Sequence, residues 1–379
     1  MSKRVLLLSV SAGAGHVRAA EALRAYADEY DDVSTLHLDV MDYVPDSFRK
    51  VYADFYIKLI SAHPHLWGML YRRSHTLNPS GLTQKMRRMT ERLSTRDLLK
   101  AIREFNPDAI ICTHFLPAEL LMHEIRRERL HVPVWVQVTD FDLHRMWVIS
   151  HMTGYFAGNE EIADRMHAHG IPPANTHVTG IPIMPAFSRA PSREACAAEY
   201  GLDPARQTFM LMGGGAGIGA LESITESLLS MEGEFQLIVL CGRNTKLLGA
   251  LQTLATKYPS RLFPQGFTNQ VERLMACADA IVTKPGGLTT SECLAMGLPM
   301  IVNAPIPGQE EHNADYLMEQ GAALKAIDAI GLVYRVRYLM QHPDKLAEMS
   351  RRAKDLGRPH AAKTVLDTVL ADIAAREGA

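Results

Sequence analysis

The chain has 379 residues, of which 47% are hydrophobic and 22% are charged, and its formal net charge is −2. This length predicts about two domains, and the nearly balanced charge argues against nucleic acid as a partner. The five cysteines form no C-x-x-C pair, which indicates reduced thiols in a cytoplasmic protein, and no run approaches the roughly 18 apolar residues of a membrane-spanning helix.

Apolar runs and helical stretches alternate along the first half of the chain. Strands are predicted at RVLLLSV and VSTLHLDV, and then over residues 108–114, 132–140, 153–159 and 175–183. One helix is expected over about 16–29, directly after the first strand, and another over 160–170. Continuous apolar strands separated by helices indicate a parallel sheet that is covered on both faces.

The same pattern starts again in the second half at QTFMLMGGGAGIGALESITESLL, which reads as strand, glycine turn and helix. Further strands are predicted at FQLIVLCG, RLFPQGF, ADAIVTKPGG and LPMIVNAP. The stretch 182–195, rich in proline, serine and alanine, separates the two halves. We therefore predict an α/β fold of two doubly wound, Rossmann-like domains that face each other across a cleft. The expected domains are 1–187 and 188–357, and a C-terminal helix in 358–379 is expected to pack back on the first domain.

The turn after the first strand reads SAGAGH, and its histidine, His16, stands where the helix is expected to begin. One alternative is a dinucleotide-dependent oxidoreductase, whose turn has the pattern G-x-G-x-x-G. Asp39 is suitably placed for the ribose-binding carboxylate of such a protein. Arg18, however, occupies the position of the third small residue, which argues against this alternative. A histidine can instead accept the proton of an attacking hydroxyl, and a helix N-terminus favours its neutral form. We interpret His16 as a candidate base, with a packed residue at the helix start as the alternative.

Two segments of the second half are typical of phosphate binding. Five glycines between residues 213 and 219 would let backbone N–H groups approach an anion. In TKPGGLTTSECLAMG, a helix expected over 288–296 presents Thr289 and Thr290 at its N-terminus. Glu292 lies one turn further, where a carboxylate can accept both hydroxyls of a ribose, and the polar loop predicted at 308–311 suits sugar hydroxyls.

These segments together resemble a known family. GGLTTSECLAMGLPMIV and PGQEEHNADYL are similar to the donor site of inverting, UDP-sugar-dependent glycosyltransferases of the GT-B type. With SAGAGHVRAAEAL, PDAIICTHFLPAELL, VTDFDLHRMWV and VTGIPIMPAF, the chain resembles the monogalactosyldiacylglycerol synthases and processive diacylglycerol glucosyltransferases from about residue 4 to 355. Many members have Gly-Gly-Gly-His in the first turn, whereas this chain has Gly13-Ala14-Gly15-His16.

The resemblance implies a role for each motif residue. It makes His16 the base or a group that positions the acceptor, and His114 and His144 are weaker candidates for the base. Asp140 is expected to bind acceptor, to orient a histidine or to cap a turn. The acceptor-binding residues are then Gly15, His114, Asp140, His144 and Trp147. The donor-binding residues are Gly214, Gly215, Ala216 and Gly217 at the diphosphate, Phe267 at the uracil, Gly287, Leu288 and Thr289 at the diphosphate, Glu292 at the ribose, and Gln309 and Glu310 at the sugar. No metal and no cofactor besides the UDP-sugar is expected, because no D-x-D cluster lies in the diphosphate-binding segments of the second half.

One strongly basic segment stands out from the neutral average. Residues 47–103 contain twelve Lys or Arg and three acids, a net charge of +9, interleaved with aromatic side chains. Such a segment suits an anionic phospholipid surface, where each basic residue contributes about 1 kcal/mol. A solvated helical face is the alternative. We predict a peripheral protein at the inner face of the cell membrane, because diacylglycerol stays in the bilayer.

The predicted reaction is transfer of a hexose from UDP-glucose or UDP-galactose to the 3-hydroxyl of 1,2-diacylglycerol, which inverts the donor to a β-glycoside. Three alternatives remain open at this point. They are a UDP-sugar glycosyltransferase with another lipid acceptor, a UDP-N-acetylglucosamine 2-epimerase, and a non-catalytic UDP-sugar sensor at the membrane. Lipid product, interconverted nucleotide sugar, and binding without turnover distinguish them.

Overall fold

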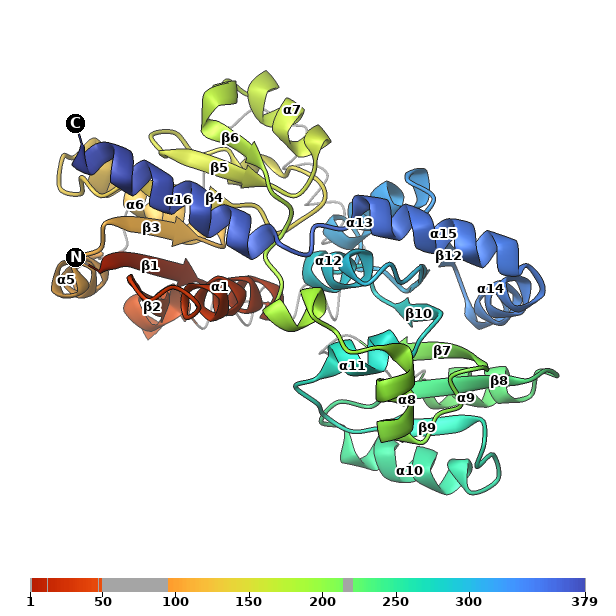
Figure 1. Ribbon diagram of the computed structural model, residues 1–379. Coiled ribbons are helices and arrows are strands. Elements are labelled where there is room, and N and C mark those ends of the chain that lie inside the picture. The colour runs from red at the N-terminus through yellow and green to blue at the C-terminus, as the bar shows by residue number, and fades with distance from the viewer. Residues whose placement is uncertain (1, 12, 47, 50–94, 214–220, 379) are drawn as a thin grey trace. The chain divides into compact units, whose positions relative to one another are not determined.

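The computed structural model describes residues 2–11, 13–46, 48–49, 95–213 and 221–378. The chain divides into two compact units. The first unit comprises Met1–Pro185, Ile306–His312 and His360–Ala379, and the second comprises Ala186–Pro305 and Asn313–Pro359. Each unit contains one six-stranded sheet (Figure 1).

The sheet of the first unit has the strand order β2-β1-β3-β4-β5-β6, and all neighbouring strands are parallel. Its strands are β1 (Lys3–Ser9), β2 (Val33–Asp39), β3 (Ala109–Cys112), β4 (Val134–Gln137), β5 (Gly154–Ala157) and β6 (Thr176–Val178). The predicted parallel sheet is thus confirmed. The strand order reverses at β1, and the carboxyl ends of β1 and β3 form the place where open α/β sheets bind ligands.

Helices cover both faces of this sheet (Figure 1). Val5 and Leu7 of β1 pack with the helices α1 (Ala14–Ala27) and α16 (Ala361–Glu377). The alternate residues Leu6 and Leu8 belong to the core on the opposite face. That core also contains apolar residues of α5 (Arg96–Phe105), α6 (Phe115–Arg126) and α7 (Glu160–Ala168). The last helix of the chain therefore helps to bury the first sheet.

The second unit repeats the design with the strand order β12-β11-β10-β7-β8-β9, again with parallel neighbours. Its strands are β7 (Gln207–Met212), β8 (Phe235–Leu240), β9 (Leu262–Gln265), β10 (Ala280–Thr283), β11 (Met300–Asn303) and β12 (Ala323–Ala326). The order reverses at β7. The edge strand β12 was not among the predicted strands, because its sequence ALKA is short and carries a lysine.

Eight α-helices complete the described part of the chain. They are α8 (Arg193–Tyr200), α9 (Leu221–Leu229), α10 (Thr245–Ala255), α11 (Val271–Ala276), α12 (Gly287–Ala295), α13 (Gln309–Glu319), α14 (Ala329–Gln341) and α15 (Pro343–Leu356). Short 3₁₀ helices occur at η1 (Val40–Tyr43), η2 (Arg145–Trp147), η3 (Pro173–Asn175) and η4 (Pro185–Ser188). Within the described ranges, no helix combines the length and the apolar character needed to cross a bilayer.

The predicted loop at 308–311 is wrong, because three of its residues open the helix α13. The carboxylate of Glu310 accepts a hydrogen bond from the backbone N–H of Ile306 at 2.6 Å. The carboxylate of Glu311 accepts one from the N–H of Gly308 at 2.9 Å. Acidic side chains that reach back to preceding N–H groups stabilise a helix start. The acidic run therefore begins a helix instead of remaining a loop.

The basic segment 47–103 lies mostly outside the described residues, which omit 47 and 50–94. Its described end includes most of α5, where Leu98, Leu99 and Ile102 are buried in the core of the first unit. The cations Arg96 and Lys100 point to the exposed side. The apolar face of this helix is occupied by protein, and most of the predicted membrane-facing segment lies outside the described residues.

Candidate active site

His16 lies in the first turn of α1, directly beyond the end of β1. Its Nδ1 atom lies 3.1 Å from the carbonyl oxygen of Thr113, which follows β3, and 2.8 Å from the Oγ1 atom of Thr139, which follows β4. A carbonyl oxygen only accepts hydrogen bonds, so Nδ1 must carry the proton. In the neutral ring, Nε2 then holds the lone pair and is the atom that can accept a proton.

The environment of His16 keeps its ring neutral. Burial lowers the pKa of His16 to about 4, although the hydrogen bond with the Thr113 backbone acts in the opposite direction. The sequence predicted a neutral ring because of the helix dipole, whereas in the structure burial is the main cause. The preceding Gly13 has a φ of +138°, and a Cβ atom at this residue would lie 3.9 Å from Nε2. Glycine at this position therefore permits the turn and keeps a side chain away from the basic nitrogen.

His114 stands beside His16 but has the opposite tautomer. Its Nδ1 atom accepts a hydrogen bond from the N–H of Leu116 at 3.0 Å and caps α6. In the neutral ring the proton therefore lies on Nε2. Burial, together with the neighbouring His16, holds the pKa of His114 well below its usual value. His114 can donate a hydrogen bond at Nε2, and this geometry argues against a role as the base.

His144 is held in the same way as His114. Its Nδ1 atom accepts a hydrogen bond from the N–H of Met146 at 3.2 Å, which caps η2. The ring is buried. The resemblance made His144 a second weak candidate for the base, whereas in the structure its Nδ1 atom caps a 3₁₀ helix.

Aromatic rings surround the two histidines at the end of the sheet. The rings of His16 and His114 are nearly perpendicular, with centroids 4.5 Å apart. The buried ring of Trp147 lies 6.2 Å from His16 and 6.1 Å from His114, and Phe115 meets Trp147 edge-on. The half-buried Gly15 immediately precedes His16 on α1. At this end of the sheet, Nε2 of His16 thus carries a lone pair and Nε2 of His114 carries a proton, beside the rings of Trp147 and Phe115.

Asp140 and Gln309, predicted to serve the acceptor and the donor sugar, are joined in the structure. The carboxylate of the buried Asp140 accepts a hydrogen bond from the side-chain amide of Gln309. Both residues belong to the first unit, which includes Ile306–His312. Two residues further along, the carboxylate of Asp142 lies 3.3 Å from the guanidinium of Arg165 and 3.5 Å from Nδ1 of His312. These contacts attach the start of α13 to the loop that follows β4.

In the second unit, the proposed phosphate-binding helix α12 begins at the buried Gly287. Leu288, Thr289 and Glu292 are half-buried along its first turns. The amide of Asn313 donates to the carbonyl of Pro285 at 3.0 Å, which holds the turn before the helix. The helix therefore presents its N-terminal N–H groups beyond β10, as the sequence predicted for an anion site.

Of the other predicted donor residues, the structure describes Phe267 but not residues 214–217. The side chain of Phe267 is 56% exposed, and the guanidinium of Arg243 lies 4.7 Å from its ring centroid. An exposed ring that stacks on a cation is available for a planar ligand. Gly214, Gly215, Ala216 and Gly217 lie outside the described residues.

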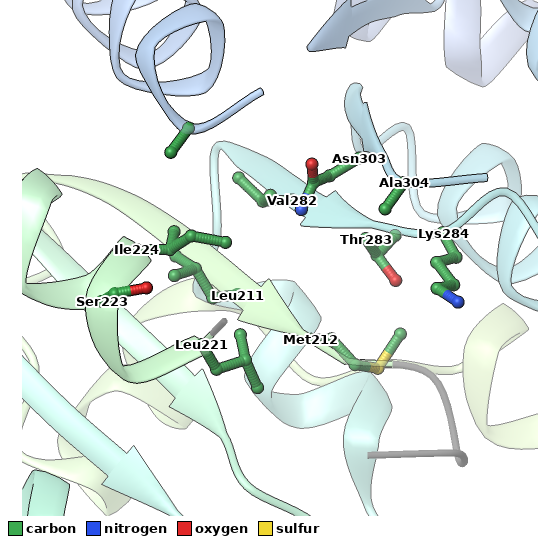
Figure 2. A pocket seen from close by; sticks show the side chains of 11 residues that line it. Leu211, Met212, Leu221, Ser223, Ile224, Val282, Thr283, Lys284, Asn303 and Ala304 are labelled. Atoms are coloured by element: carbon green, nitrogen blue, oxygen red, sulfur yellow. The ribbon is translucent and has the colours of Figure 1, made fainter. Parts of the chain in front are cut away.

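A cavity of about 190 Å³ lies where the strand order of the second sheet reverses. Figure 2 shows Leu211, Leu221 and Ile224 on its apolar side and Thr283 and Lys284 on the opposite side. Asn303, at the end of β11, also lines it. The cavity is smaller than the several hundred Å³ of a typical ligand site.

Four polar residues of these two sites were not predicted from the sequence. They are Thr113, Thr139, Lys284 and Asn303. Each lies at or just beyond the carboxyl end of a buried strand, in the motifs CTHF, VTDF, VTKPGG and IVNAP. Since parallel strands place their carboxyl ends at one edge, this position is the signal that could have found them.

Two parallel, doubly wound units with polar groups at both reversal points define a protein of the GT-B fold class. The structure of Acinetobacter baumannii MurG matches with a TM-score of 0.63 and 16% identity, over 97% of this chain and 99% of that one. UDP-GlcNAc 2-epimerase from Neisseria meningitidis matches with a TM-score of 0.61 and 13% identity, over 98% and 100% of the two chains. At these identities the likeness shows the fold.

Sequence comparison then specifies the family. The model of monogalactosyldiacylglycerol (MGDG) synthase matches residues 16–183, and that of the glycosyltransferase family 28 C-terminal domain matches 208–365. A probable monogalactosyldiacylglycerol synthase 2 of Oryza sativa is 30% identical over 95% of this chain and 78% of its own length. A processive diacylglycerol beta-glucosyltransferase of Bacillus pumilus is 27% identical over 97% and 95%. The chain belongs to the monogalactosyldiacylglycerol synthase family, which confirms the resemblance seen in its motifs.

Proposed function

We propose that this protein is an enzyme that transfers a hexose from a UDP-hexose to the 3-hydroxyl of 1,2-diacylglycerol and inverts the anomeric carbon. The names of the rice and Bacillus relatives support the acceptor and the reaction class. The single observation that carries the mechanism is the Nδ1–H of His16, which is directed to the Thr113 carbonyl and leaves Nε2 as a base. A non-catalytic sensor has no acceptor hydroxyl to deprotonate.

In the proposed reaction, Nε2 of His16 takes the proton of the glycerol hydroxyl. The hydroxyl oxygen then bonds to the anomeric carbon from the face opposite UDP, and the bond between that carbon and the phosphate oxygen breaks with its electron pair. Thr113 and Thr139 accept from Nδ1–H and so stabilise the imidazolium that forms. The acceptor is held by Gly15, Asp140, His144 and Trp147 and by the Nε2–H group of His114.

Most of the residues proposed to bind the donor belong to the second unit. The N-terminal N–H groups of α12, at Gly287–Thr289, stabilise the diphosphate as its charge develops, and Lys284 adds a cation. Glu292 binds the ribose and Phe267 the uracil. Gln309 and Glu310 contact the sugar, and residues 214–217 border the diphosphate. The proposal includes no cofactor besides the nucleotide sugar.

The proposed place of action is the inner face of the cell membrane, to which the protein attaches peripherally through its basic segment 47–103. A lipid acceptor supports action at a membrane, because diacylglycerol does not leave the bilayer. The net charge of +9 in this segment supports attraction to anionic phospholipids.

The reaction class is tested by product analysis with the full chain. Diacylglycerol in anionic vesicles is supplied with UDP-glucose and, separately, with UDP-galactose. We expect one of the two to give a glycosyl diacylglycerol whose anomeric proton coupling in NMR is that of a β-glycoside. An α-glycoside would contradict the inverting mechanism. Interconversion of free UDP-N-acetylglucosamine without any glycolipid would show an epimerase instead, and donor binding without product would show a sensor.

Thr139 is proposed as a positioning residue for His16, since its hydroxyl lies 2.8 Å from Nδ1. Thr139→Val keeps the shape of the side chain and removes one hydrogen bond worth about 1 kcal/mol, so we expect kcat to fall about fivefold. The KM for the donor should not change. The acid limb of the pH profile should move to lower pH, because the protonated ring loses an acceptor. Thr139→Ser should restore both readouts, and a Val variant with normal kcat and pH profile would contradict the assignment.

A further inference from the structure

A groove of about 490 Å³ lies along α14 and the edge strand β12 in the second unit. Its lining residues are apolar, aromatic or cationic: Met318, Ala323, Leu324, Tyr334, Tyr338, Lys325, Arg335 and Lys345. No acid is among them. None of these residues lines the cavity shown in Figure 2. The groove is therefore a separate concave surface with a positive charge.

Exposed apolar side chains lie next to this groove. Ile327 is 92% exposed and Ile330 is 82% exposed, and Tyr334 of the groove is 53% exposed. Ile330 and Tyr334 are four residues apart on α14 and so lie on one side of the helix, and Ile327 precedes the helix in the turn after β12. Two neighbouring isoleucines left in water give no folding benefit, and exposed apolar side chains grouped in this way are typical of a contact surface.

Aromatic rings connect the apolar and cationic parts. The guanidinium of Arg335 lies 5.3 Å from the ring centroid of Tyr334. The ring centroids of Tyr334 and Tyr338 are 6.3 Å apart, and those of Tyr338 and His342 are 4.2 Å apart; both pairs are stacked. The ammonium of Lys345 also contacts Glu348 at 3.0 Å, which offsets part of the positive charge. Exposed isoleucines next to tyrosines and cations are typical of a surface that contacts the boundary between lipid headgroups and acyl chains.

We propose that this surface, formed by Ile327, Ile330 and the α14 groove, is a second contact of the protein with an anionic phospholipid membrane. The headgroup phosphates lie near Lys325, Arg335 and Lys345, and the two isoleucines enter the acyl boundary. Charge decides this occupant, because phospholipids supply anionic phosphate and apolar chains side by side, and none of the groove's lining residues is acidic. The exposed acid between the isoleucines, Asp328, caps α14 by accepting a hydrogen bond from the N–H of Gly331 at 2.6 Å. The inference goes beyond the proposed function, which assigns membrane attachment to residues 47–103 of the first unit.

The first test places an environment-sensitive fluorophore at position 330 of the full chain. All five native cysteines are buried, so Ile330→Cys can be labelled selectively. The control is Gln252→Cys, an exposed position on α10 of the same unit. With vesicles containing phosphatidylglycerol, we expect blue-shifted, brighter emission from position 330 and no change from position 252. With phosphatidylcholine alone, the change at 330 should be much smaller. Unchanged emission at 330 while the protein still sediments with the anionic vesicles would overturn the proposal.

The second test removes the charge while the probe stays in place. The triple change Lys325→Gln, Arg335→Gln and Lys345→Gln should weaken the response at position 330 about fivefold for each cation lost. The matched control is Arg337→Gln, which lies on the same helix but outside the groove lining. This change should affect the response at position 330 less than the triple change does. An unaltered response in the triple variant would overturn the proposal. So would a blue shift without vesicles that grows with protein concentration, which would show that a second copy of the chain covers this surface.

Discussion

Replacing His16 with alanine is expected to lower kcat by about 10³-fold, the usual contribution of a general base. The physical reason is that Nε2 of His16 is the unprotonated nitrogen beside the ends of β1, β3 and β4, whereas His114 and His144 use Nδ1 as acceptors in helix caps. The measurement is glycolipid formation under saturating donor. Retention of UDP binding, measured by calorimetry, separates the loss of the base from the loss of the fold.

The matched control for this variant is His177→Ala. His177 is a half-buried histidine of the same unit whose ring packs near Trp135 and Phe156 on β4 and β5. The substitution His177→Ala should lower the stability of the protein somewhat and leave kcat within a few-fold of the value for the unmodified protein. If folded, UDP-binding His16→Ala turned over at a near-normal rate, the assignment of the base would be wrong.

The pH dependence of the unmodified enzyme follows from the same residue. Because the pKa of His16 is lowered to about 4, its base form persists throughout the neutral range, and kcat/KM should fall only as the pH approaches 4. Stability has a related dependence. The unfolded chain binds a proton at His16 below its ordinary pKa of about 6.5, whereas the folded chain does not until about pH 4. Folding stability should therefore decrease as the pH falls through this window, and this part of the decrease should be absent in His16→Ala.

The second large effect is expected from Gly357→Ala in the second unit. A Cβ atom at Gly357 would lie 2.5 Å from the carbonyl oxygen of Leu294 and 3.1 Å from Cα of Ala295, both in the backbone of α12. The φ of Gly357 is −61°, which alanine adopts readily, so the effect is steric. Overpacking of this kind costs about 1–3 kcal/mol. We expect a lower free energy of unfolding and, because α12 is the proposed diphosphate helix, a weaker affinity for UDP.

The control for Gly357→Ala is Gly249→Ala on α10, where the added Cβ would meet no atom within 4 Å. Alanine within a helix should raise stability slightly there, by about 0.5–1 kcal/mol. Urea unfolding and UDP titration of both variants provide the comparison. Unchanged UDP affinity in a clearly destabilised Gly357→Ala protein would argue that α12 does not hold the diphosphate.

The sequence by itself determined the architecture and the chemical class of the site. Continuous apolar strands such as RVLLLSV and FQLIVLCG, separated by helices, predicted two parallel sheets because strands buried on both faces have no polar alternation. The turn at residues 13–16 placed a histidine at the carboxyl end of the first strand. Local patterns specify such features because the strand, the turn and the helix start are neighbours in sequence.

Only the tertiary structure decided which groups surround that histidine. Thr113 and Thr139 lie 97 and 123 residues from His16 in the chain, yet both contact its Nδ1 atom and thereby select the tautomer. Asp140 and Gln309, 169 residues apart, are joined by a hydrogen bond that no local pattern indicates. Burial, and not the helix dipole, is the main cause of the lowered pKa of His16. Tautomer and pKa depend on which atoms exclude water from the ring, and packing of distant strands sets this.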